Sequence, residues 1–114
     1  MSEWRWISRE AAIAVHERQL AEHGGGEGTR DPGMLDSALA RARNLAAYGE
    51  PDAAALAAAY AFGIARNHPF VDGNKRTAWV LARLFLALND RSLRYGDAEA
   101  VLTMLALAAG DLSE

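Results

Sequence analysis

One short segment of the chain combines side chains suited to proton transfer, metal binding and phosphate binding. It reads His68-Pro69-Phe70-Val71-Asp72-Gly73-Asn74-Lys75-Arg76 and separates two long, very apolar stretches. Imidazole groups change their charge close to neutral pH, so His68 is a candidate general base. Asp72 offers a carboxylate, the kind of group that holds Mg²⁺ together with substrate phosphates.

The same segment leads into a predicted helix that begins at Asn74. The first N–H groups of a helix have no intrahelical acceptor and attract anions. Gly73 has no Cβ, so a phosphate could approach the backbone closely there. Lys75 and Arg76 place two cations in a first turn where the helix dipole disfavours them. A bound polyphosphate would offset this local cost, and the pattern therefore predicts an anion site.

Asp72 would repel phosphates at this position unless a divalent cation lay between them. A base, a metal-binding carboxylate and a phosphate-binding helix end together indicate phosphoryl or nucleotidyl transfer to a hydroxyl group. The competing interpretation is structural: Asp72 or Asn74 only caps a helix, and Arg76 is a solvated surface charge. The Gly-x-x-x-x-Gly-Lys-Ser/Thr pattern of an ordinary P-loop does not occur in the sequence.

The other two histidines have simpler interpretations. His16 lies on an apolar helix face and is expected to pack in the core or at its boundary. His23 is expected near the C-terminus of the same helix, where the dipole is negative. A metal site built from His16, His23 and His68 is only weakly supported by their positions.

The rest of the sequence predicts a bundle of about five helices that positions the polar segment. The expected helices cover about 9–23, 32–47, 53–67, 74–89 and 98–109. The helix at 74–89 is almost wholly apolar after Thr77, which is typical of a helix buried in the middle of a fold. Gly24–Arg30 is the one long flexible stretch. The expected architecture is all-α, with a possible two-stranded β element formed by residues 1–7 and Arg91–Tyr95.

Composition limits the classes of protein to consider. The 114 residues suit a single domain, 1–114, and 51% of them are hydrophobic against 24% charged. Twenty-five are alanine, which favours helices in close contact. Cysteine is absent and the net charge is −3, so there is no disulfide framework, thiolate metal site or basic nucleic-acid footprint. No membrane span or secretory signal is recognisable, and a cytoplasmic protein that does not bind nucleic acid or membranes is expected.

The polar segment resembles the signature of the Fic/Doc family, His-x-Phe-x-(Asp/Glu)-Gly-Asn-x-Arg, and the resemblance extends over nearly the whole chain. Adenylylating Fic proteins continue Gly-Asn-Gly-Arg-x-x-Arg. This chain has Lys75 in place of the second glycine and Trp79 in place of the second arginine, and so looks like the Doc branch, the death-on-curing toxins. Arg30-Asp31-Pro32-Gly33-Met34-Leu35 looks like that branch as well.

The resemblance implies a function and a set of roles. Doc proteins are toxin kinases that use ATP and Mg²⁺ to phosphorylate a threonine of elongation factor Tu and arrest translation. By this likeness His68 is the base, Asp72 the Mg²⁺ ligand, and Phe70 the apolar anchor of the loop. The phosphate-binding residues would be Gly73, Asn74, Lys75 and Arg76.

The resemblance also implies a separate regulator. The self-inhibiting Ser/Thr-x-x-x-Glu-Gly/Asn helix of many Fic proteins is not found in the sequence, so control would come from an antitoxin whose disordered tail folds as a helix on the toxin. The family's last C-terminal helix would be absent or trimmed. Two alternatives stay open: an adenylyltransferase of the same fold, and an inactive protein-binding module.

Overall fold

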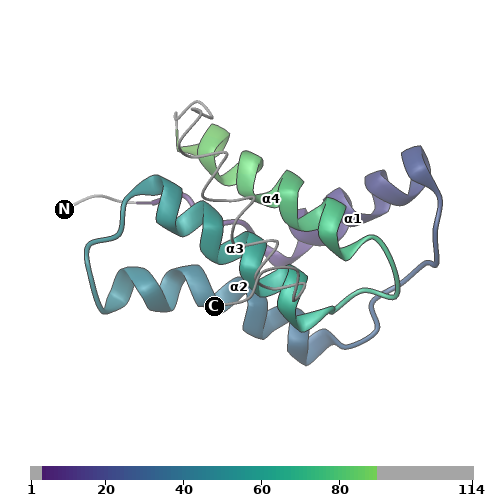
Figure 1. Ribbon diagram of the computed structural model, residues 1–114, viewed down its shortest axis with the longest axis horizontal. Helices are drawn as coiled ribbons and strands as arrows, with labels where there is room; N and C mark the ends of the chain where they lie inside the picture. The colour runs from purple at the N-terminus through teal and green to yellow at the C-terminus, as the bar shows by residue number, and fades with distance from the viewer. Residues whose placement is uncertain (1–3, 90–114) are drawn as a thin grey trace, which may run out of the picture.

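The computed structural model describes residues 4–89 as four α helices joined by short loops. They are α1 (Arg9–His23), α2 (Pro32–Ala47), α3 (Ala53–Asn67) and α4 (Asn74–Leu88). Figure 1 shows them packed in an all-helical arrangement, with the α1–α2 and α3–α4 loops at the same end of the molecule. The predicted boundaries of α1, α2 and α3 are confirmed, and α4 ends one residue before Asn89. The expected helix 98–109 and strand Arg91–Tyr95 lie outside the described residues.

Side-chain caps explain where the first three helices begin. The side chain of Ser8 accepts a hydrogen bond from the N–H of Ala11 at 3.1 Å. Asp31 and Asp52 cap α2 and α3 in the same way, at 3.1 Å and 2.8 Å. Each cap satisfies one N–H that the helix leaves unpaired, which is worth about 1 kcal/mol.

The most buried of the four helices is α3, and not α4, which the sequence predicted to lie in the middle of the fold. It packs against α2 on one side and α4 on the other, and α1 packs against α4 and α2. Nine of its fifteen residues are buried, against seven in α4. Small side chains allow the close approach of α3 to α2: a Cβ built on Gly63 would lie only 2.8 Å from the carbonyl oxygen of Ala38. The prediction of close contacts between alanine-rich helices is therefore confirmed.

The optional β element is not seen in the part of the chain that the structure describes. Residues 4–8 form no strand, and the β-type pairing within 4–89 is one isolated antiparallel bridge between Thr29 and Phe70. Trp4 and Trp6 alternate with a charged residue, Arg5, and both tryptophan rings pack near Phe85, at 5.8 and 5.9 Å between centroids. Within the described residues, the period of two therefore corresponds to packing of an extended segment against Phe85.

No helix within residues 4–89 is both long and apolar enough to cross a membrane.

Candidate active site

The loop between α3 and α4 begins with an unusual backbone conformation at His68. His68 ends α3 with φ 49° and ψ 54°, in the left-handed region, and its N–H donates to the carbonyl of Ile64 at 3.1 Å. For a residue other than glycine this conformation costs roughly 1–2 kcal/mol. Pro69 follows, is buried, and disfavours continuation of the helix. The imidazole of His68 is exposed at the end of α3.

A second chain segment, residues 28–31, runs alongside this loop. The N–H of Val71 donates to Gly28 at 3.1 Å, and the N–H groups of Arg30 and Asp31 both donate to the carbonyl of Pro69, at 2.7 and 3.0 Å. The stretch Gly24–Arg30 was predicted to be flexible. Its second half is instead fixed by backbone hydrogen bonds to the polar segment, a long-range pairing for which local composition gives no signal.

The side chain of Phe70 lies in the core. It is buried and stacks on the ring of His16, with 3.8 Å between centroids and 6° between planes. Asn74, which is also buried, holds the backbone of Phe70 from the other side: its Oδ1 accepts from the Phe70 N–H and its Nδ2 donates to the Phe70 carbonyl, both at 3.0 Å. Because the side-chain amide of Asn74 is used in this way, its predicted phosphate binding would act through the backbone N–H.

His16 contributes more than the packing expected from the sequence. It is 2% exposed, and its Nε2 lies 2.8 Å from the carbonyl oxygen of Asp72, to which it must donate. Sequence reasoning missed this role. A signal was present, because a polar ring on a buried helix face needs a hydrogen-bond partner.

Asp72 is exposed, and two backbone N–H groups approach its carboxylate. Oδ1 accepts from Gly73 at 2.8 Å and Oδ2 from Gly26 at 3.4 Å. These hydrogen bonds, Gly73 first, lower the pKa of Asp72, and the charge of Arg76 acts in the same direction. The carboxylate is therefore ionised at neutral pH and accessible to a cation.

Neither Asp72 nor Asn74 caps α4. The N-cap is Gly73, in the left-handed region at φ 76°, and no side chain caps the first turn. The structural interpretation of the segment as a capped helix start is therefore not supported. Lys75 and Arg76 are both exposed in that first turn. Backbone N–H groups and two cations thus gather beside an ionised carboxylate.

Glycines let the segment 24–26 lie close against the loop. A Cβ on Gly25 would lie 2.8 Å from Oδ2 of Asp72, and one on Gly26 would lie 2.8 Å from a methyl group of Val71. Behind this contact, an open cavity of about 670 Å³ separates the segment 24–29 from α1, with Ile13, His16, Leu20 and Glu27 among its lining residues. Among its lining residues, His16 is the one that is hydrogen-bonded to the carbonyl of Asp72.

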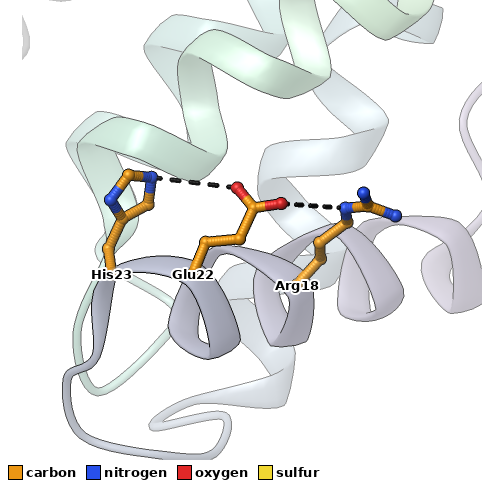
Figure 2. Close-up of polar contacts among 3 residues, drawn as sticks. All are labelled: Arg18, Glu22 and His23. Atoms are coloured by element: carbon orange, nitrogen blue, oxygen red, sulfur yellow. Dashed lines mark hydrogen bonds and ion pairs between the residues drawn. The ribbon is translucent and has the colours of Figure 1, made fainter.

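The remaining histidine, His23, is the last residue of α1, as its sequence position predicts. Figure 2 shows Glu22 between Arg18 and His23, with Arg18 Nε at 3.1 Å and His23 Nε2 at 3.9 Å from its carboxylate oxygens. Exposed pairs of this kind contribute little stability. Within residues 4–89 no group of three or more His, Cys, Asp or Glu side chains is placed to hold a metal ion.

The fold and the site together define a class of protein. A helical bundle presents an exposed histidine, an ionised carboxylate and an uncapped helix start on one loop, and a sequence profile of the Fic/DOC family matches residues 6–86, most of the chain. The chain belongs to the Fic/DOC family.

Two relatives place the chain among the Doc members of that family. It is 38% identical to the "Protein kinase doc" of Escherichia phage P1 over 110 residues, which cover 96% of this chain and 86% of the phage protein. It is 48% identical to the "Toxin Doc" of Mycolicibacterium smegmatis over 69 residues, which cover 58% of this chain and 52% of that toxin. The resemblance drawn from the residues is confirmed by these matches.

Proposed function

We propose that this protein is the toxin of a toxin–antitoxin pair and acts as a protein kinase. It transfers the γ-phosphate of ATP to the hydroxyl of a Ser or Thr residue, and the proposed target protein is elongation factor Tu. The observation that carries the proposal is the grouping of His68, Asp72 and the cationic, uncapped start of α4 on one loop. The names of the two relatives, a protein kinase and a toxin, support it.

Each part of the loop would have one task in this reaction. The imidazole of His68 accepts the proton of the target hydroxyl as its oxygen bonds to the γ-phosphorus. The bond from that phosphorus to the bridging oxygen breaks, and ADP leaves. The first N–H groups of α4, with Lys75 and Arg76, hold the phosphates. Asp72 would bind Mg²⁺, which supplies charge neutralisation on the phosphate oxygens.

Lys75 and Trp79 favour phosphate transfer over adenylyl transfer. Lys75 is exposed in the first turn of α4, where the adenylylating pattern has glycine. A lysine side chain at this position would occupy space in which phosphates could lie on the backbone, and its charge would attract the terminal phosphates. Trp79 is half-buried and packs against the core, and it cannot offer the charge of the second arginine. Nucleotide bound in the reverse direction would present its γ-phosphate to His68.

Label transfer distinguishes the candidate reactions. Elongation factor Tu is incubated with the protein, Mg²⁺ and ATP labelled on either the γ- or the α-phosphate. The proposal expects label on the target from γ-labelled ATP only, and a loss of about 10²–10⁴-fold in the His68→Ala variant. Label from α-labelled ATP would indicate an adenylyltransferase. No label from either nucleotide, on elongation factor Tu or on any protein of a cell extract, would favour the inactive binding module.

The proposed partner is an antitoxin whose disordered tail folds as a helix on the toxin. Such a segment repays its ordering cost through buried apolar surface. Circular dichroism of a tail peptide mixed with the protein should show helix beyond the sum of the separate spectra. Spectra that simply add would count against this mode of binding.

A further inference from the structure

We infer that Arg30 is a positioning residue for His68: it binds three successive carbonyl groups at the end of α3 and so fixes the backbone that carries the proposed base. The inference rests on the proposed function for its catalytic meaning. It concerns a residue outside the polar segment, 38 positions earlier in the chain.

The hydrogen bonds of Arg30 converge on consecutive residues. Its Nε and Nη2 donate to the carbonyl of His68 at 2.9 and 2.6 Å, and Nη2 also donates to the carbonyl of Asn67 at 3.1 Å. Its backbone N–H donates to the carbonyl of Pro69 at 2.7 Å. A planar guanidinium can serve two neighbouring carbonyls at once, whereas an ammonium group is a single point of charge.

These carbonyls need an external donor. The last carbonyls of a helix have no intrahelical N–H partner, and the helix end is the negative pole of its dipole. A cation at that end is therefore favourable. His68 is also held in the left-handed region at φ 49°, a conformation that persists only where the surroundings enforce it. Turning the His68–Pro69 peptide back to an ordinary conformation would break both bonds from Arg30 to His68 and swing the imidazole away.

Arg30 is itself attached to a rigid element. The next residue, Asp31, caps α2, and Asn67 donates through Nδ2 to the carbonyl of Met34 at 3.0 Å. The bond from Asn67 to Met34 therefore connects the end of α3 to the first turn of α2, close in sequence to Arg30. Its side chain is exposed, so truncation leaves no cavity in the core. Loss of Arg30 should consequently alter the placement of His68 and leave the fold intact.

A double-mutant cycle tests whether Arg30 acts through His68. Phosphate transfer is measured for the wild type, Arg30→Ala, His68→Ala and the double variant. Arg30→Ala should lower kcat by about 10- to 100-fold, the cost of a misplaced catalytic group, and leave the KM for ATP within about threefold. Arg30→Lys should recover only part of the rate. In the His68→Ala background, Arg30→Ala should cause no further loss. Arg83→Ala, which removes an exposed arginine of α4, is the matched control and should transfer like the wild type.

Amide hydrogen exchange gives a second readout that needs no enzyme activity. The N–H of His68, bonded to Ile64, should exchange about tenfold faster in Arg30→Ala than in the wild type or in Arg83→Ala, while the N–H groups within α2 keep their protection. The inference would be overturned if the exchange rate of the His68 N–H were the same in Arg30→Ala and the wild type. It would also be overturned if Arg30→Ala lowered kcat by the same factor in the wild type and in the His68→Ala background. The two proposals can also fail separately. If the wild type transfers no phosphate, but the His68 N–H still exchanges faster in Arg30→Ala, the proposed kinase is refuted and the positioning of His68 by Arg30 stands.

Discussion

The buried imidazole of His16 donates a hydrogen bond from α1 to the carbonyl of Asp72, across 2.8 Å and 56 positions of sequence. The same ring stacks on Phe70 at 3.8 Å. One core side chain therefore holds both the apolar anchor of the loop and the backbone of its carboxylate. This arrangement explains why a polar ring occupies a buried position of α1.

Replacement of His16 should separate its two contacts. His16→Phe keeps an aromatic ring against Phe70 but removes the hydrogen bond to the Asp72 carbonyl, at a cost of about 1 kcal/mol. We expect a lower urea midpoint and a transfer rate reduced by roughly tenfold, because the loop is no longer fixed. His16→Gln retains a donor and should keep more of the activity, though less of the stacking. Equal transfer rates for His16→Phe and the wild type would show that the hydrogen bond does not position the loop.

Asp72→Asn tests the metal-binding role. The substitution preserves shape but removes the charge that a cation needs, so Mg²⁺ should no longer strengthen nucleotide binding. Isothermal titration of ATP with and without Mg²⁺ measures this directly for both proteins. Identical effects of Mg²⁺ in the two proteins would assign Asp72 a purely structural role.

The same variant also tests a predicted pH dependence of the free energy of unfolding. The folded-state pKa of Asp72 lies below its ordinary value because of the N–H groups of Gly73 and Gly26. Ionised Asp72 therefore stabilises the fold above the unfolded pKa of about 4, and this contribution disappears as the pH falls through the lowered pKa. Urea midpoints of the wild type and Asp72→Asn should differ at neutral pH and converge below about pH 4. A difference that does not change with pH would contradict the role of the ionised carboxylate.

Gly25→Ala should reduce activity by disturbing Asp72. Gly25 has φ +126°, and its added Cβ would lie 2.8 Å from Oδ2 of Asp72. Gly28→Ala is the matched control, since Gly28 also has a positive φ of +97° but an added Cβ would meet nothing within 4 Å. Both variants carry backbone strain of about 1 kcal/mol, which thermal denaturation measures. Only Gly25→Ala should also weaken the Mg²⁺ dependence of nucleotide binding, and equal behaviour of the two variants would show that the contact with Asp72 has no effect.

The helices could be predicted from the sequence because their limits are set locally. Ser8, Asp31 and Asp52 cap the helices that follow them, and Pro69 ends α3. The loop residues with chemical side chains were recognisable for the same reason, since they are adjacent in the chain.

The supports of the site could not be predicted in this way. His16 reaches Asp72, and Arg30 reaches His68, across 56 and 38 positions, and such contacts follow from packing of the helices and not from neighbouring residues. Residues 4–7 show the opposite difference: their alternation suggested a strand, but the structure describes none there, and both tryptophan rings lie near Phe85.

Lys75→Gly tests the preference for phosphate over adenylyl transfer. The change removes one cation and reopens the backbone of α4 to the nucleotide, so kinase activity should fall sharply. A weak adenylyl transfer could then emerge, limited by Trp79 in place of an arginine. Lys75→Arg keeps the charge but not the compact ammonium, and partial loss is expected. Full kinase activity in Lys75→Gly would remove the argument that Lys75 sets the direction of the nucleotide.

The most direct measurement is the intact mass of purified elongation factor Tu after incubation with the wild-type protein and Mg-ATP, beside the His68→Ala variant. A protein kinase that uses His68 as its base predicts a mass increase of one phosphate group with the wild type and almost none with the variant. An increase of one AMP, or equal phosphorylation by both proteins, would contradict it.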